Sequence, residues 1–295
     1  MTANPDTANP AIGASVDAGG ILTNYLDAGD PAGPPVVLLH GSGPGVSAYA
    51  NWRLTVPALA DTHHVLAPDR VGFGYTQRPD GYHYTMDNWV THIEAFVAAL
   101  GLQSYSVVGN SFGGALALRL AAKHPGQVRR LVLMGSVGVP FSMTEGLDAV
   151  WGYEPSVPAM RRVMDFFAYN RELITDELAA TRYEASVQPG FQESYAAMFP
   201  APRQRWLDAM STDENTIRGV QCPTLIVHGR EDRVIPPDTS RQLFELIPNA
   251  QLHMFGKCGH WTQIEHAAEF NHLVASFLAD EQQSLLADQL KKRPS

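Results

Sequence analysis

Apolar residues along the chain gather in short runs that end in glycine or polar residues. Six runs have the length of buried strands: residues 36–40, 64–67, 105–109, 131–134, 224–227 and 251–255. Between most of them, apolar residues recur every three or four positions, as in 89–100 and 115–123, which predicts amphipathic helices. This alternation predicts an α/β fold with a mostly parallel sheet and helices on both faces. Residues 21–26 and the segment before them predict an antiparallel hairpin at one edge.

The rhythm changes between residues 139 and 213. This stretch lacks strand-like runs, is rich in aromatic residues and arginine, and contains several prolines. It is too long for a loop between two strands. We therefore expect a helical cap, residues 139–213, inserted into a core formed by residues 1–138 and 214–295. The first dozen residues are expected to form a loose arm, and residues 284–290 one or two helical turns before a polar tail.

Composition narrows the functional classes. Apolar residues make up 45% of the 295 positions, which is enough for a large core, and the formal net charge is −9. That charge argues against a nucleic-acid or anionic-membrane partner. Neither a secretory signal nor a membrane-spanning run stands out, so we expect a cytoplasmic protein. The two cysteines, Cys222 and Cys258, are expected to be buried free thiols.

One pentapeptide carries a candidate nucleophile. Residues 109–113 read Gly-Asn-Ser-Phe-Gly, follow an expected strand and open an expected helix. This matches the G-x-S-x-G elbow, in which small neighbours let a strained turn present the Ser111 hydroxyl above the sheet. The turn also leaves the Phe112 N–H free at a helix N-terminus, where it can stabilise an oxyanion. The alternative is a helix-opening turn with a capping serine.

Later loops supply an acid and a base in the order Ser, acid, His. Asp232 follows the fifth expected strand, and His260 follows the sixth. Asp232 would orient His260, which would take the Ser111 proton. Glu231 is a competing acid. We favour Asp232, because the acid of this fold usually follows Gly-Arg or Gly-x by one or two residues.

The loop after the first expected strand, His-Gly-Ser-Gly-Pro-Gly at 40–45, has the position of an oxyanion loop. The Ser42 N–H would pair with that of Phe112, and His40 is expected to be a buried structural residue. The loop does not match the nucleotide-binding motif Gly-x-Gly-x-x-Gly, because its third glycine would stand at position 46, which is valine. His266, Glu269 and His272 have conceivable metal-ligand spacing, but a solvent-facing helix explains them better. We expect no metal and no other cofactor.

Together, the motifs at 40–45, 51–53, 109–114, 229–232 and 258–261 resemble those of the meta-cleavage product hydrolases of the α/β-hydrolase fold. These enzymes cut a carbon–carbon bond in ring-fission products of aromatic compounds. The resemblance covers residues 26–278. The cap segments 149–153, 182–185 and 188–194 look most like the branch that acts on 2-hydroxymuconic semialdehyde.

The resemblance implies further site residues. The 2-hydroxy/oxo-carboxylate end of the substrate would be bound by Asn51, Asn110, Arg182 and Trp261, and Gly43 is expected to be a further substrate-binding residue. The alternatives are a surface role for Arg182, loop-stabilising roles for the two amides and plain packing for Trp261. From the fold, the walls of the acyl pocket are expected to be Val137, Leu207 and Ile235, whose bulk would favour a small acyl group.

Two other functions stay open at this point: a carboxylesterase or lactonase on the same triad, and a ligand-binding receptor of the same fold. A serine at the elbow argues against epoxide hydrolases and haloalkane dehalogenases, which use aspartate there. We also expect a small-molecule substrate and a homo-oligomer.

Overall fold

The computed structural model describes the backbone of residues 9–291 and side chains up to residue 279. Its sheet has the strand order β1-β2-β4-β3-β5-β6-β7-β8. β1 and β2 form an antiparallel hairpin, and β2 is also antiparallel to β4, whereas the neighbours from β4 to β8 are parallel. The six predicted core strands and the edge hairpin are confirmed. The bounds are β1 Ala14–Asp17, β2 Leu22–Ala28, β3 Pro35–Leu39, β4 His64–Pro68, β5 Tyr105–Asn110, β6 Val128–Met134, β7 Thr224–Gly229 and β8 Ala250–Phe255.

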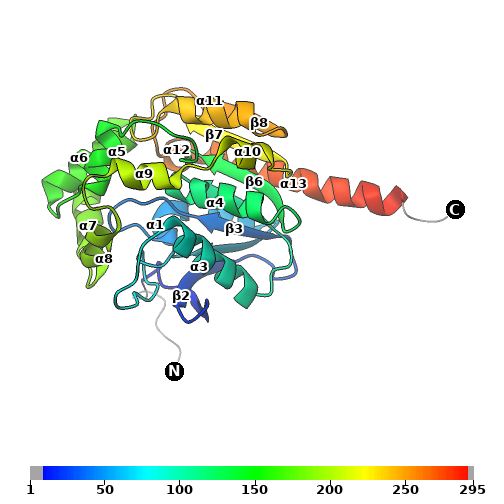
Figure 1. Cartoon of the computed structure of the whole chain (residues 1–295), viewed down its shortest axis with the longest axis horizontal. Helices are drawn as coiled ribbons and strands as arrows, with labels where there is room; N and C mark the ends of the chain where they lie inside the picture. The colour runs from blue at the N-terminus through cyan, green and yellow to red at the C-terminus, as the bar shows by residue number, and fades with distance from the viewer. Residues whose placement is uncertain (1–8, 292–295) are drawn as a thin grey trace.

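Helices cover both faces of this sheet, as the alternation predicted (Figure 1). Successive side chains of a strand point to opposite faces, so Val37 and Leu39 join one core cluster while Val36 and Leu38 join the other. The first cluster includes residues of α3 and α4, and the second includes residues of α1, α2 and α13. The bounds are α1 Ala48–Trp52, α2 Val56–Ala60, α3 Met86–Ala99, α4 Phe112–Lys123, α10 Glu214–Arg218, α11 Pro237–Leu246, α12 Thr262–Glu265 and α13 Ala267–Lys291.

The predicted insertion is present as helices between β6 and β7, and Figure 1 shows them gathered at one end of the sheet. Threonine or serine side chains at positions 144, 156 and 175 cap the N-termini of three of them by accepting a backbone N–H. The bounds are α5 Glu145–Trp151, α6 Val157–Phe167, the 3-10 helix η1 Arg171–Leu173, α7 Asp176–Ser186, α8 Phe191–Met198 and α9 Gln204–Met210.

The parallel register brings the carboxyl ends of several strands to one edge. Leu39 is paired with Gly109, Gly109 with Leu133, and Met134 with Val227. Because parallel strands all end at the same edge, the loops that follow β3, β5, β7 and β8 meet there, beneath the cap. This edge is where the sequence placed its candidate chemistry.

The chain ends differ from the expected arm and tail. Asn9 to Ala11 are fixed on the core, where Ala11 C=O accepts a hydrogen bond of 2.9 Å from Asn24; the rest of the predicted arm, residues 1–8, lies outside the described residues. The predicted turns at 284–290 belong to the single long helix α13. Both cysteines are buried free thiols, as predicted. Among the described residues, no helix is long and apolar enough to cross a membrane.

Candidate active site

Ser111 occupies a sharp turn between β5 and α4. Its φ of 55° and ψ of −117° are unusual for a residue with a side chain. The glycines around it make the turn possible: a Cβ on Gly109 would come within 2.4 Å of the Gly113 carbonyl oxygen. A Cβ on Gly113 would lie 2.2 Å from the Leu39 carbonyl oxygen. This is the strained geometry that the elbow motif predicts.

Asp232 and His260 meet on neighbouring loops, after β7 and β8. His260 Nδ1 lies 2.7 Å from Asp232 Oδ2, and both side chains are buried. A carboxylate only accepts, so Nδ1 carries the proton and Nε2 is left as the basic nitrogen. Glu231 instead pairs with Arg230 at 2.7 Å and accepts the Cys258 N–H. Of the two acids, Asp232 therefore faces the histidine.

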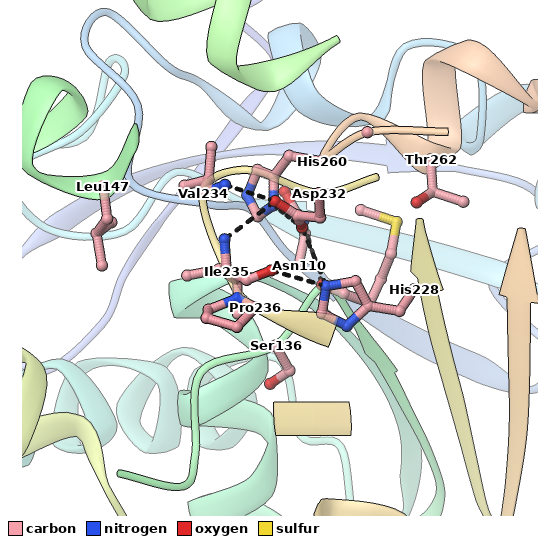
Figure 2. Close-up of polar contacts among 12 residues, drawn as sticks. Asn110, Ser136, Leu147, His228, Asp232, Val234, Ile235, Pro236, His260 and Thr262 are labelled. Carbon is pink, nitrogen blue, oxygen red and sulfur yellow. Dashed lines mark hydrogen bonds and ion pairs between the residues drawn. The ribbon is translucent and has the colours of Figure 1, made fainter. Parts of the chain in front are cut away.

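The Asp232 carboxylate accepts four hydrogen bonds, as many as it has lone-pair sites. Oδ1 accepts the backbone N–H groups of Val234 at 2.7 Å and Ile235 at 3.0 Å. Oδ2 accepts His260 and, at 3.1 Å, Nε2 of His228, so that the two rings flank Asp232 in Figure 2. Burial alone would raise the pKa of Asp232, but the His260 charge and the histidine hydrogen bonds outweigh it and hold the pKa well below its usual range.

His228, at the end of β7, is a further residue of the site that the sequence analysis did not identify. Its Nε2 lies 3.1 Å from both Asp232 Oδ2 and the Ile235 carbonyl oxygen, two acceptors, so this nitrogen carries the proton. Nδ1 lies 2.6 Å from the Ser240 hydroxyl, which holds the ring in place. His228 thus donates a hydrogen bond to the acid that orients His260. The strand pattern alone could not reveal this, because His228 reads as an ordinary strand-end residue.

The glycine-rich loop after β3 lies against the elbow. A Cβ on Gly41 would be 3.6 Å from the Ser111 Cβ and 3.0 Å from Asn110 Oδ1. Phe112 is the first residue of α4, so its N–H has no partner within the helix. The Ser42 and Phe112 N–H groups therefore lie on two segments that flank Ser111, as an oxyanion hole requires.

A cavity of about 630 Å³ lies between this edge of the sheet and the cap. Its size suits a small-molecule ligand. Ser111 and His260 line it, together with Gly43 and the four residues that the resemblance assigned to the carboxylate end: Asn51, Asn110, Arg182 and Trp261. The structure thus brings these separate sequence motifs to one chamber.

The polar lining offers hydrogen-bond donors and cations to a ligand. Arg182 Nη2 lies 3.3 Å from the Pro44 carbonyl oxygen, and within the described part of the chain its guanidinium has no carboxylate partner. Burial and then the nearby Arg53, which also lines the cavity, lower the Arg182 pKa to about 10, so it stays charged at neutral pH. Asn51 accepts the Gly41 N–H through Oδ1, whereas its buried Nδ2 has no partner among the described residues. Such groups suit a carboxylate.

The expected acyl-pocket walls do not line this cavity. Val137, Leu207 and Ile235 are buried in the core, and the apolar lining comes instead from residues that include Leu147, Val150, Phe167 and Val234. The reason is the path of the loops: Val137 N–H donates to the Ser111 carbonyl at 3.2 Å, beside the elbow. Ile235 N–H is directed at Asp232. A strand end fixes the edge at which a loop starts but not its course, so the assignment of these three residues as acyl-pocket walls stays a prediction.

Two cap residues contact the oxyanion loop, a role that the sequence did not reveal. Trp151 Nε1 donates to Ser42 Oγ at 3.0 Å, and the Tyr195 hydroxyl lies 3.0 Å from the Ser42 carbonyl oxygen. Many aromatic residues of the cap simply pack. Trp151 and Phe199 are stacked at 4.3 Å, but these two polar ends also tie the cap to the core.

Comparisons with known proteins agree with this geometry. The family model described as alpha/beta hydrolase fold matches residues 34–267. The 2-hydroxy-6-oxo-2,4-heptadienoate hydrolase of Pseudomonas putida F1 is 60% identical over 273 residues, which cover 92% of this chain and 98% of that protein. The 2-hydroxymuconate semialdehyde hydrolase of Pseudomonas sp. strain CF600 is 57% identical over 272 residues, covering 92% and 95%.

A solved structure gives the same result. The meta-cleavage product hydrolase from Pseudomonas fluorescens IP01, a serine-to-alanine mutant complexed with acetates, superposes with a TM-score of 0.91. It is 56% identical, and the match covers 92% of this chain and all of that one. Fold, sequence and structure agree over the core and the cap alike. The chain therefore belongs to the meta-cleavage product hydrolases of the α/β-hydrolase fold.

Proposed function

We propose that this enzyme hydrolyses the C5–C6 bond of a 2-hydroxy-6-oxohexa-2,4-dienoate with hydrogen or a short alkyl group at C6, using Ser111, His260 and Asp232. The observation that carries the proposal is one cavity that holds both the serine elbow and Arg182, a cation without a carboxylate partner in the described chain. The relatives that act on 2-hydroxymuconate semialdehyde and 2-hydroxy-6-oxo-2,4-heptadienoate support this substrate class.

The reaction begins with a change in the substrate, because carbon leaves poorly unless its electron pair is delocalised. The 2-hydroxyl proton is transferred to C5, which gives the 2-oxo-3-enoate. Cleavage of C5–C6 from this form places the electron pair in conjugation with the 2-oxo group. This end of the molecule would be bound by Arg182, Asn51, Asn110 and Trp261, which would favour the charge that develops there.

The Ser111 hydroxyl then adds to the C6 carbonyl as His260 Nε2 takes its proton. The Ser42 and Phe112 N–H groups would stabilise the resulting oxyanion, and Asp232 would stabilise the protonated His260. Collapse breaks C5–C6, releases 2-hydroxypenta-2,4-dienoate after protonation and leaves an acyl group on Ser111. Water activated by His260 hydrolyses this ester to a small carboxylic acid. The net reaction therefore consumes one molecule of water for each substrate cleaved.

The test is turnover of the yellow ring-fission products that bear hydrogen, methyl or phenyl at C6, followed by absorbance, with an aryl acetate as the ester comparison. We expect cleavage of the first two, and we expect Ser111→Ala to lower kcat by about a millionfold, as loss of the serine does in subtilisin. A protein that hydrolyses the aryl acetate but none of the three dienoates would be an esterase. Near wild-type cleavage by a folded Ser111→Ala variant would refute the nucleophile.

Two finer expectations stay predictions: a homo-oligomeric state and a cytoplasmic location. Size-exclusion chromatography with light scattering measures the first, and cell fractionation measures the second.

A further inference from the structure

We propose that Arg70 is a positioning residue for the oxyanion hole, holding the Gly41–Ser42 peptide so that the Ser42 N–H faces the reacting carbonyl. This inference rests on the proposed role of Ser42. Arg70 comes two residues after β4 and is fully buried, and it does not line the cavity. Its Nη2 donates to the Gly41 carbonyl at 2.7 Å.

The neighbouring His40 has a protonation state that the contacts define. Its Nε2 accepts the Arg70 backbone N–H at 3.2 Å, so Nε2 carries no proton. Burial and then the Arg70 charge lower the pKa of His40 well below its usual value, so the ring is neutral. Nδ1 must then carry the proton and donate to the Gly41 carbonyl at 2.7 Å. The Gly41 carbonyl therefore accepts two hydrogen bonds, one of them from a cation.

These bonds fix the Ser42 N–H. In a trans peptide the C=O and the N–H point to opposite sides of one rigid plane. The Gly41 carbonyl points to buried Arg70, whereas Gly41 and Ser42 themselves line the cavity beside Ser111. The N–H of the same plane is thus directed to the cavity side. Hydrogen bonds to the carbonyl also polarise the peptide and strengthen its N–H as a donor.

Arg70 contacts the other half of the hole as well. Its Cζ lies 4.3 Å from the centre of the Phe112 ring, which is a cation–π distance, and 4.9 Å from that of Phe73. Phe112 supplies the second N–H donor. One buried guanidinium therefore contacts both segments that flank Ser111.

The contacts of Arg70 do not match those of an ordinary structural ion pair. Its Nε and Nη1 have no hydrogen-bond partner among the described residues. The adjacent Asp69 carboxylate is bonded instead to Asn24 and to the N–H groups of Ala48 and Tyr75. A buried cation without a bonded carboxylate is costly. A role in positioning the Gly41–Ser42 peptide accounts for a cation buried at this place.

The experiment compares Arg70→Met and Arg70→Lys with a matched control, Arg78→Met. Arg78 also follows β4, donates to a backbone carbonyl (Gly74, 2.8 Å) and stacks on a phenylalanine ring at 4.3 Å, but it does not contact the oxyanion loop. Circular dichroism and melting establish that each variant is folded. Since deleting one oxyanion donor costs about 10²–10³-fold in kcat, misplacing one should cost about 10–100-fold in Arg70→Met. The Lys variant should lose less, the control should lose little, and KM should change little.

The decisive readout is an alkylboronic acid, which forms a tetrahedral adduct with the serine and places an anionic oxygen in the hole. Its inhibition constant should rise in Arg70→Met by the same factor by which kcat/KM falls. The Kd of a 2-oxo carboxylate bound to the corresponding Ser111→Ala proteins should not change. Equal losses for both ligands, or unchanged boronate inhibition in the folded Met and Lys variants, would overturn the proposal. The same comparison of kcat/KM can be made with an aryl acetate, because ester hydrolysis on Ser111 uses the same oxyanion hole. The role of Arg70 can therefore be tested even if the enzyme does not cleave the proposed C–C substrates.

Discussion

Replacement of Arg182 tests the link between the cavity and the substrate. The guanidinium lies in the cavity wall on α7, and with a pKa of about 10 it is charged at the pH of any ordinary assay. Its hydrogen bond to the Pro44 carbonyl is long, at 3.3 Å, which leaves most of its donors for a ligand. Arg182→Met removes the charge and keeps an apolar stem of similar reach.

The size of the loss follows from the kind of contact. A hydrogen bond to a charged group contributes about 1.5–3 kcal/mol, which is about 10- to 150-fold in kcat/KM. We expect that loss for the 6-methyl dienoate, a smaller one in Arg182→Lys, and almost none for a neutral aryl acetate. Arg161→Met is the matched control, because Arg161 is an exposed arginine of the same cap that pairs with Asp176.

Absorbance assays of the two substrates on the same enzyme stocks give the comparison. A parallel loss on the dienoate and on the ester would show that Arg182 supports the cap and does not bind the carboxylate. A loss in Arg161→Met as large as that in Arg182→Met would show that the cap responds to any missing arginine. Either result would refute the reasoning.

Three other predictions concern the acyl end, acid stability and the elbow. Because branched side chains line the cavity, the 6-phenyl substrate should have a kcat/KM about 10- to 100-fold below that of the 6-methyl substrate. Leu147→Ala should reduce this difference more than Val137→Ala does. An unchanged ratio in Leu147→Ala would show that the acyl group does not bind beside Leu147. Burial and then the Arg70 charge lower the pKa of His92 to about 4. In the unfolded chain the histidine pKa is near 6.5, so between pH 6.5 and pH 4 the unfolded state binds more protons at His92 than the folded state does. The free energy of unfolding should therefore fall by up to about 3 kcal/mol through His92 as the pH drops over this range. Urea unfolding should therefore show a steeper acid loss in the wild type than in His92→Gln, and parallel curves would contradict this. Gly109→Ala should lower the melting temperature and kcat together, since its Cβ would meet the Gly113 carbonyl at 2.4 Å; a fully active, equally stable variant would show that the elbow relaxes freely.

The fold, the strained turn at Ser111 and the contact between Asp232 and His260 were predictable because their signals are local. A buried strand, a glycine elbow and a strand-end loop are each written within a few neighbouring residues, and the parallel topology then brings the strand ends together. The elbow motif alone predicts the strained backbone that Ser111 adopts. Asp232 and Glu231 are adjacent in the sequence, so choosing between them needed knowledge of the fold, and the structure shows the difference in their partners.

The other contacts depend on how distant segments pack, and no local signal encodes that. Trp151 reaches Ser42 across 109 positions, and Arg70 reaches Gly41 across 29. Before the structure, Trp151 is one cap aromatic among many. The course of the loops near the acyl end is likewise not encoded locally: the Val137 N–H donates to the Ser111 carbonyl, and the cap contributes Leu147 to the cavity lining.

The contacts of the cap show why binding and catalysis depend on the same insertion. The Phe167 carbonyl accepts the His260 N–H at 2.7 Å, and Trp151 bonds the Ser42 side chain, so cap residues hold both the base loop and the oxyanion loop. Arg182, the proposed carboxylate anchor, stands on another helix of the same insertion and bonds the Pro44 carbonyl of that oxyanion loop. A substrate carboxylate bound to Arg182 would therefore lie against the same loop that carries the Ser42 N–H. Binding energy from the carboxylate end, remote from the bond that breaks, can in this way be used at the reacting carbonyl.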